Sequence, residues 1–225
     1  NKGLSSYPVD SVDSLHLQIE AMKLALVDAY RYIADPETMD ATVEQLLDPS
    51  YLSDRADQID LSVAGDPGHG VPAKGGTVYL TAADANGMMV SFIQSNYMGF
   101  GSGIVVPETG ISLQNRGSGF VLQEGHPNQV GQRKRPFQTI IPAFLTMDCE
   151  PVMSFGLMGG PMQAQGHVQM VVRLADYDQN PQAAADAPRF QILQGRAMAI
   201  EADFPSATLK GLASRGHQLQ WMPRD

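Results

Sequence analysis

The chain has 225 residues, of which 43% are hydrophobic and 17% are charged, and this composition excludes disorder, collagen and a long coiled coil. Its formal net charge of −9 at pH 7 repels phosphate backbones, and the basic cluster Arg133–Arg135 is too small to offset it, so we exclude a nucleic-acid partner. A single cysteine, Cys149, excludes an internal disulfide.

No run of the sequence approaches the roughly 18 apolar residues that a membrane helix needs, so we expect no membrane segment in this chain. The first residue is Asn1 rather than methionine, and any signal segment would lie outside the chain. The sequence therefore leaves the compartment open between the cytoplasm and a secreted or periplasmic location.

The first third of the chain is expected to be helical. Ser11 or Ser14 can cap the start of a first helix, and Asp35–Pro36 ends it. Two shorter helical stretches follow, at Val43–Leu47 and Leu52–Ile59. The apolar positions of the first helix recur three or four residues apart, as one buried face requires: Leu15, Ile19, Met22, Leu26, Tyr30 and Ile33.

The pattern changes from helix to strand after a glycine- and proline-rich linker at Ser62–Gly76. Two strand-like runs, Thr77–Ala83 and Met88–Ser95, are joined by Asp84–Gly87, which contains the hairpin signal Asn-Gly. The remaining segments alternate between strands and helices, which predicts a layered α+β fold. They are expected strands at Ile140–Met147, Val152–Leu157, Ala197–Glu201 and Gln218–Met222, and expected helices at Met162–Tyr177 and Ser206–Arg215.

Thr77 is the first candidate for chemistry, because the linker places a hydroxyl residue at the start of a strand. Threonine is a good strand former, and an ordinary structural role would explain it. Alternatively, the Thr77 hydroxyl attacks the Gly76 carbonyl, cuts the chain, and leaves Thr77 with a free α-amine. That amine has an unperturbed pKa near ~8 and can serve as the general base for its own hydroxyl.

The segments Thr77–Asp84, Asn86–Gly87 and Ser95–Gly103 together resemble the start of the small subunit of γ-glutamyltranspeptidases. Upstream, His16–Ala25 and Ala34–Pro36 resemble the end of that family's large subunit. The resemblance thus covers nearly the whole chain. Other motifs in the family's order are Gly110–Asn115, Lys134–Pro136, Met158–Gly160, Asp186–Arg189 and Gly216–His217.

The resemblance implies a four-layer αββα fold of the N-terminal nucleophile hydrolases, made as a precursor and cut between Gly76 and Thr77. Residues 1–76 would be the end of the large-subunit region, and residues 77–225 the small, catalytic subunit. Thr77 matches the nucleophile, and Ser95 stands where the family has a threonine that supports it. Gly159 and Gly160 match the pair whose backbone N–H groups form an oxyanion hole.

The substrate-binding positions depart from the family. Where the family has an asparagine, a glutamine and an aspartate, this chain has Tyr97, Arg116 and Gly119. Where the family has a pair of serines, this chain has Gln138 and Thr139. Positive charge thus replaces negative charge, which predicts acyl groups that end in a carboxylate and lack an α-ammonium.

Asn115 matches a family asparagine and is a further candidate for substrate binding, although it can equally shape a turn.

We therefore predict a self-processing γ-glutamyltranspeptidase-like amidohydrolase or acyltransferase that forms an acyl-enzyme on Thr77. The alternatives are a glutaryl- or cephalosporin-type acylase with the same mechanism, or a non-catalytic homologue. Expected partners are a small-molecule amide and the remaining part of the large subunit. No cofactor is expected, because Gly99–Gly103 lacks the spacing of a dinucleotide loop. No metal is expected either, because the five histidines show no paired metal spacing: His16, His69, His126, His167 and His217.

Overall fold

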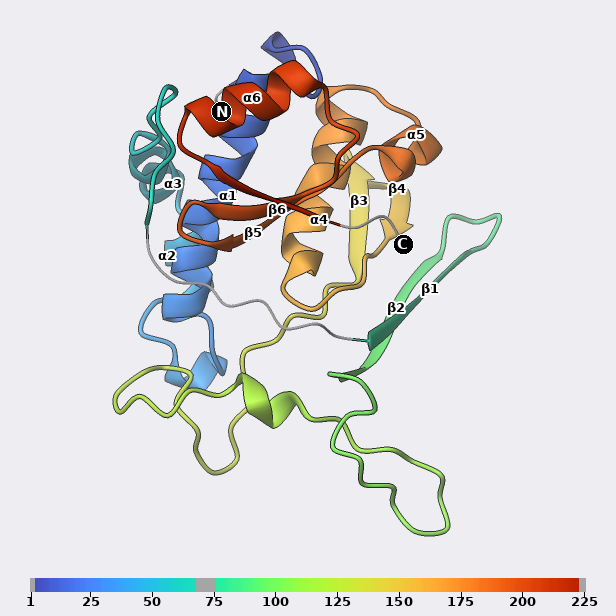
Figure 1. Cartoon of the computed structure of the whole chain (residues 1–225). Helices are drawn as coiled ribbons and strands as arrows, with labels where there is room; N and C mark the ends of the chain where they lie inside the picture. The colour runs from blue at the N-terminus through green and yellow to red at the C-terminus, as the bar shows by residue number, and fades with distance from the viewer. Residues whose placement is uncertain (1–2, 68–75, 223–225) are drawn as a thin grey trace. The chain divides into compact units, whose positions relative to one another are not determined.

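A computed structural model describes residues 3–67 and 76–222 of the chain (Figure 1). Most of the expected linker, including His69, lies outside these described residues. The chain forms two compact packing units, Asn1–Val71 with Val168–Asp225, and Pro72–His167. This division concerns packing, whereas the expected boundary after Gly76 concerns where the chain would be cut.

The first unit is built on the long helix α1 (Val12–Tyr32), as the apolar periodicity predicts. Ser11 is its N-cap, and the Ser11 side chain accepts a hydrogen bond from the Ser14 N–H. Short helical segments precede and follow it: η1 (Leu4–Ser6), η2 (Pro36–Thr38), α2 (Val43–Leu46) and α3 (Pro49–Ala56). The predicted helical first third is confirmed, with α3 beginning at Pro49 because the Asp48 side chain caps it.

A three-stranded sheet packs on one face of α1 and forms the core of this unit. Its order is β5 (Phe190–Gln194), β6 (Ala197–Ile200) and β7 (Gln218–Trp221), with β5–β6 antiparallel and β6–β7 parallel. The parallel crossover passes through α6 (Ser206–Ser214). The strand β5 was not predicted. The core consists of Leu15, Ile19, Met22, Phe190, Ile192, Met198, Ile200, Phe204 and Leu212.

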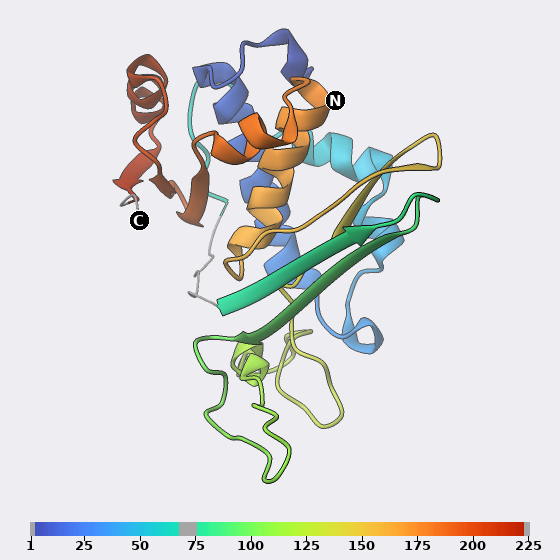
Figure 2. The same cartoon turned by 90° about the vertical axis from the view of Figure 1, so that its right-hand side faces the viewer.

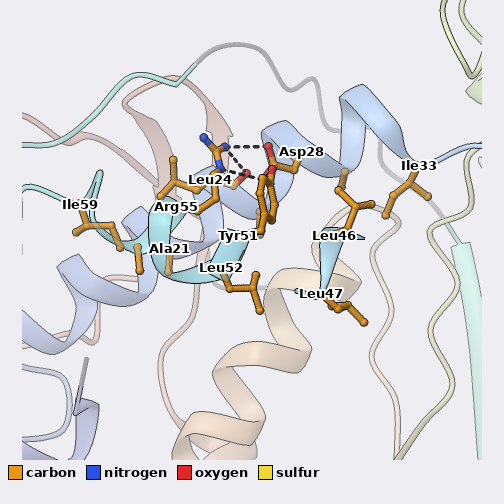
Figure 3. A pocket seen from close by; sticks show the side chains of 13 residues that line it. Ala21, Leu24, Asp28, Ile33, Leu46, Leu47, Tyr51, Leu52, Arg55 and Ile59 are labelled. Carbon is orange, nitrogen blue, oxygen red and sulfur yellow. Dashed lines mark hydrogen bonds and ion pairs between the residues drawn. The ribbon is translucent and has the colours of Figure 1, made fainter. Parts of the chain in front are cut away.

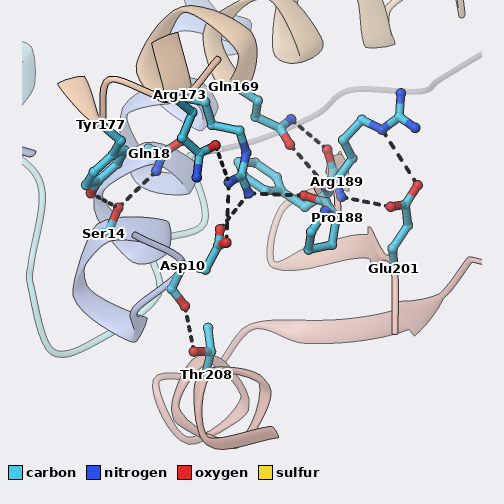
Figure 4. Close-up of polar contacts among 12 residues, drawn as sticks. Asp10, Ser14, Gln18, Gln169, Arg173, Tyr177, Pro188, Arg189, Glu201 and Thr208 are labelled. Atoms are coloured by element: carbon cyan, nitrogen blue, oxygen red, sulfur yellow. Dashed lines mark hydrogen bonds and ion pairs between the residues drawn. The ribbon is translucent and has the colours of Figure 1, made fainter. Parts of the chain in front are cut away.

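Buried polar side chains brace the same unit (Figure 4). Arg173 pairs with Asp10 at 2.5 Å, and both ends of the Gln169 amide bond the backbone of Phe190, at 2.9 and 3.1 Å. Gln169 therefore supplies edge hydrogen bonds to β5 that a neighbouring strand would otherwise provide.

Helix α4 (Met162–Val171) ends in a π-helical turn, Val172–Asp176, where a continuous α-helix to Tyr177 was expected. Arg173 lies in this turn and also donates to the Pro188 carbonyl. The short helix α5 (Pro181–Asp186) follows.

The second unit contains two β-hairpins. The strands β1 (Gly76–Ala83) and β2 (Met89–Tyr97) pair antiparallel, as the Asn-Gly signal predicts (Figure 2). The strands β3 (Ala143–Met147) and β4 (Glu150–Phe155) form the second hairpin.

The expected strand start at Ile140 is wrong by three residues. Pro142 cannot donate to a ladder, and the N–H of Ile141 bonds the side chain of Gln163 instead of another strand.

The first hairpin has one polar and one apolar face. Thr81 bonds Ser154 of β4 through its hydroxyl, and Tyr79 lies so close to Gly156 that a Cβ there would be 2.3 Å from the ring. On the opposite face Val78, Leu80, Val90 and Phe92 are exposed. The polar face therefore packs within the unit, whereas the side chains of the apolar face remain exposed in the described chain.

Candidate functional site

Thr77 and Ser95 lie side by side at the open end of the first hairpin. The Thr77 hydroxyl donates to the Ser95 hydroxyl at 3.1 Å. The ladder between them is irregular, since Gly76 pairs with Tyr97 but Val78 pairs with Gln94. One residue of β1 thus faces two residues of β2, and such bulges re-aim side chains beside active sites.

Tyr97 continues the site from Ser95. Its N–H donates to the same Ser95 oxygen at 2.9 Å, so Ser95 accepts from both the nucleophile candidate and the backbone. Tyr97 has a φ of 76°, which is rare for a residue with a side chain, costs about 1–3 kcal/mol, and persists only where the surroundings impose it. Strain of this kind is concentrated at functional sites.

Arg116 lies over the ring of Tyr97, with its guanidinium carbon 5.1 Å from the ring centroid. Its Nη1 donates to the Thr139 hydroxyl at 3.4 Å, and Arg116 is only 7% exposed. Within residues 3–67 and 76–222, no carboxylate pairs with this guanidinium. Burial lowers the pKa of Arg116, but an arginine stays charged in proteins. A buried cation without a counter-ion is costly, and a bound anion would offset that cost.

The other predicted substrate residues differ in their surroundings. Thr139 is buried beside Arg116, whereas Gln138 is exposed. The Asn115 amide bonds Met98 through both its ends, at 2.9 and 3.3 Å, and donates to the Gly101 carbonyl at 3.1 Å. The contacts of Asn115 thus fit the alternative role of shaping the loop.

Gly159 and Gly160 form the turn before α4, with φ values of 120° and 59° that favour glycine. Their carbonyls accept hydrogen bonds from Met162 and Gln163, at 3.2 and 3.0 Å. Neither glycine amide donates to another residue of the part that the structure describes. The oxyanion role of these two N–H groups stays a prediction, and their lack of an acceptor in the described chain leaves room for it.

Two buried residues of this unit were missed. Asn128 donates to the Gly119 carbonyl at 2.7 Å and accepts from the Phe137 N–H at 2.9 Å, and so fixes two loops. Gln163 accepts from Ile141 at 2.9 Å. Sequence spacing gives no signal for either, because both act on backbone groups of irregular segments.

The first unit holds a buried cluster that contains His16, Glu20 and His217, whose ligand atoms are close enough to hold a metal ion. Sequence spacing gave no signal for this cluster, because His16 and His217 are 201 positions apart in the chain. His16 Nε2 donates to the Asp60 carbonyl at 2.8 Å, so its Nδ1 accepts from His217 Nε2, also at 2.8 Å. The ligand nitrogens are thus already paired.

Lys23 supplies the cation of this cluster. Its ammonium lies 2.9 Å from Glu20 and 3.0 Å from the Gly65 carbonyl. Because this charge would repel a second cation, the cluster fits a hydrogen-bonded brace better than a metal centre.

A separate pocket of about 280 Å³ lies between α1 and the helices α2 and α3 (Figure 3). Leu24, Leu46 and Leu52 are among its apolar lining residues, and one end is polar, where Asp28 accepts from Tyr51 and pairs with Arg55. The lining of the pocket is mostly apolar, as in a groove left between packed helices. The described residues around it include no activated nucleophile.

Comparison with known families identifies the class of protein. The chain matches the family described as "Gamma-glutamyltranspeptidase" over residues 2–225. It belongs to the γ-glutamyltranspeptidase family.

Several known proteins are similar to the chain. It is 35% identical over 217 residues to the glutathione hydrolase-like YwrD proenzyme of Bacillus subtilis, covering 93% of this chain and 41% of that protein. It is also 35% identical over 218 residues to the oxamate amidohydrolase proenzyme of Klebsiella pneumoniae, covering 94% and 41%. The chain therefore spans about two fifths of the length of these relatives.

Among solved structures, a cephalosporin acylase from Bacillus halodurans is similar with a TM-score of 0.90 and 49% sequence identity, covering 97% of this chain and 40% of that chain. None of the helices in the described part of the chain has the length and apolarity to cross a bilayer.

Proposed function

We propose that this chain carries the nucleophile of a self-processing amidohydrolase or acyltransferase, and that Thr77 is that nucleophile. The observation that carries the proposal is the hydrogen bond from the Thr77 hydroxyl to Ser95 at 3.1 Å, at a bulge on the first strand after the linker. Membership of the γ-glutamyltranspeptidase family and relatives named as proenzymes support it.

In the first reaction, the Thr77 oxygen attacks the Gly76 carbonyl carbon, and the peptide C–N bond breaks as an ester forms. Water hydrolyses the ester, which leaves a carboxylate on Gly76 and a free amine on Thr77. In turnover, that amine takes the hydroxyl proton and the Thr77 oxygen attacks the carbonyl carbon of the substrate amide; the substrate C–N bond then breaks, and the leaving amine departs with that proton. The acyl-enzyme then passes its acyl group to water or to an amine.

The Gly159–Gly160 turn would stabilise the oxyanion formed in each attack. Two free backbone N–H groups on residues without side chains can approach a tetrahedral intermediate closely. Losing one such donor typically costs ~3–4 kcal/mol of barrier. Ser95 would orient the nucleophile, because its oxygen accepts from both Thr77 and Tyr97.

The described chain is mixed α and β, and we propose that it completes a four-layer αββα fold with the rest of its precursor. The relatives are more than twice its length. The exposed apolar side chains of Val78, Leu80 and Phe92 on one hairpin face, and of Phe144 and Val152 on the other hairpin, support a further layer. The remaining large-subunit segment is the proposed partner.

Intact-mass measurement tests the nucleophile. For the wild-type chain we expect two fragments, separated between Gly76 and Thr77. Thr77→Ser keeps the hydroxyl and should also be cut; it would stay a single chain only if the methyl group is needed to strain the junction. Thr77→Ala should abolish cleavage altogether. An uncut wild-type chain after long incubation would favour the non-catalytic alternative, and cleavage that persists in Thr77→Ala would exclude Thr77.

For the substrate, we propose an acyl group that ends in a carboxylate and lacks an α-ammonium, such as glutaryl. Arg116 is a buried guanidinium without a carboxylate partner in the described chain, and Thr139 adds a hydroxyl beside it. One relative is named an oxamate amidohydrolase, and one similar structure is a cephalosporin acylase; both names are consistent with such a site. Oxamate contains a carboxylate and an amide and has no ammonium.

The kcat/KM values of purified, cleaved protein on glutaryl and γ-glutamyl anilides decide the substrate class. We expect the glutaryl anilide to be the better substrate, because Arg116 repels the ammonium of a glutamyl group. A preference for the γ-glutamyl anilide would overturn the substrate class and leave the Thr77 mechanism intact.

A further inference from the structure

Gln163 connects two parts of the proposed site. It lies in the first turn of α4, is fully buried, and accepts a hydrogen bond from the Ile141 N–H through Oε1 at 2.9 Å. Its own backbone N–H donates to the Gly160 carbonyl at 3.0 Å. One residue therefore holds both the oxyanion turn and the segment that follows Thr139.

The orientation of the Gln163 amide follows from its partner. Because the Ile141 N–H is a donor, the atom that faces it must be the carbonyl oxygen of the side chain. The Gln163 Nε2 is then buried, and it has no hydrogen-bond partner among the described residues. Burying an unpaired donor is unfavourable, so stability alone does not explain why a glutamine stands here.

His167 fixes Gln163 from the next turn of α4. Its Nδ1 lies 2.6 Å from the Gln163 carbonyl, and its ring lies 5.1 Å from the ring of Phe155 in β4. Burial lowers the pKa of His167, and because the partner of Nδ1 is a backbone carbonyl, Nδ1 is the nitrogen that carries a proton. The start of α4 is thus held against β4 while Gln163 reaches Ile141.

We propose that Gln163 is a positioning residue: it sets the position of the carboxylate-binding residues Arg116 and Thr139 relative to the Gly159–Gly160 turn. Ile141 lies two residues beyond Thr139, whose hydroxyl accepts from Arg116. The side chain of Gln163 thus fixes where the substrate carboxylate binds, and its backbone fixes where the oxyanion forms. This inference rests on the proposed function.

The experiment compares Gln163→Met with Gln169→Met. Gln169 lies on the same helix, is similarly buried, and bonds Phe190 of β5 through both ends of its amide. It therefore controls for the loss of a buried glutamine whose amide bonds β5 and not Ile141. Gln163→Glu is the conservative variant, because its buried carboxyl group is expected to be protonated and neutral and keeps an acceptor oxygen for Ile141.

Three quantities are measured on the purified protein: kcat/KM for glutaryl anilide, the affinity for free glutarate by calorimetry, and the melting temperature. We expect Gln163→Met to lower kcat/KM roughly 10- to 100-fold, as a misplaced substrate would, and to weaken glutarate binding about tenfold. Gln169→Met should lower the melting temperature but preserve both substrate quantities. Gln163→Glu should restore glutarate binding to within about threefold of wild type.

Unchanged glutarate affinity in Gln163→Met, or equal losses in both methionine variants, would overturn the positioning role. Wild-type protein that binds glutarate but hydrolyses no anilide would contradict the proposed function, and the binding measurements would still decide the role of Gln163. Wild-type protein that neither binds glutarate nor hydrolyses its anilide overturns both.

Discussion

The hydroxyl of Thr77 and the hydroxyl of Ser95 are joined by a 3.1 Å hydrogen bond across the irregular end of β1 and β2. Ser95 also accepts from the N–H of Tyr97, whose positive φ is sterically unfavourable. The backbone therefore fixes the Ser95 oxygen, and that oxygen fixes the direction of the Thr77 side chain.

Replacing Ser95 should slow the chemical step. We expect Ser95→Ala to lower kcat about fivefold, because a typical hydrogen bond of about 1 kcal/mol orients the nucleophile. Ser95→Thr keeps the hydroxyl and should retain most activity. Ser91→Ala is the control, since the Ser91 hydroxyl lies further along the same strand and bonds Tyr79. Equal losses in Ser95→Ala and Ser91→Ala would show that hairpin stability, and not orientation, explains the effect.

Substitutions at Arg116 should change selectivity more than overall activity. We expect Arg116→Gln to lower kcat/KM for glutaryl anilide by about 10- to 100-fold, because it removes charge-assisted hydrogen bonds of roughly 1.5–3 kcal/mol each. Activity on an uncharged butyryl anilide should change much less. Arg116→Lys should recover only part of the preference, because an ammonium cannot bind both carboxylate oxygens in parallel. An unaltered ratio in Arg116→Gln would place the guanidinium outside the acyl site.

The stability of the protein should fall in mild acid because of His217. Burial, followed by the positive charges around it, lowers the pKa of His217 to about 3, against an unfolded value near ~6.5. The unfolded state therefore binds a proton that the folded state excludes between these pH values. The free energy of unfolding should decrease as pH falls from about 6.5 towards 3, by at most about 1.4 kcal/mol per pH unit. The charged or titratable neighbours that contribute are Lys23, His16, Arg215 and Arg196.

Urea unfolding between pH 4 and pH 7 measures this slope. His217→Gln should flatten it, because glutamine can still donate to His16 but does not titrate. His126→Gln serves as the control, since the His126 ring is only partly buried. A slope that is the same in wild type and His217→Gln would contradict the assignment.

The pair of Arg173 and Asp10 should contribute to stability far more than a surface pair. Arg173 is buried and Asp10 is mostly shielded, with side-chain exposures of 7% and 19%. Asp10→Asn preserves the shape and tolerates the φ of 58° at this position, so the loss reports mainly on charge.

We expect a decrease of about 2–3 kcal/mol in the free energy of unfolding, somewhat below the ~3–5 kcal/mol for a fully buried pair. In the exposed pair of Arg31 and Asp40 the side chains are 50% and 52% exposed. Asp40→Asn should therefore change the free energy of unfolding by no more than about 0.5 kcal/mol. Equal effects of the two substitutions would show that burial does not strengthen the Arg173 pair.

The sequence by itself determined the elements whose signals are local. The spacing of Leu15, Ile19 and Met22 predicts α1, and the Asn-Gly signal predicts the first hairpin, because helix faces and short turns depend on neighbouring residues. The motif around Thr77 likewise predicted the family. The strand β5 was missed, because its edge bonds to Gln169 and its place in the core depend on residues distant in the chain.

Only the tertiary structure decided which polar groups meet. His16 and His217 are separated by 201 positions in the chain yet share a 2.8 Å hydrogen bond, and Gln163 reaches Ile141 in a segment without regular structure. The absence of a carboxylate beside Arg116 in the described chain could not be read from composition, since 24 acidic residues were available. Hydrogen bonds and charge pairing depend on distances of about 3 Å, and those distances are set by how elements distant in the chain pack together.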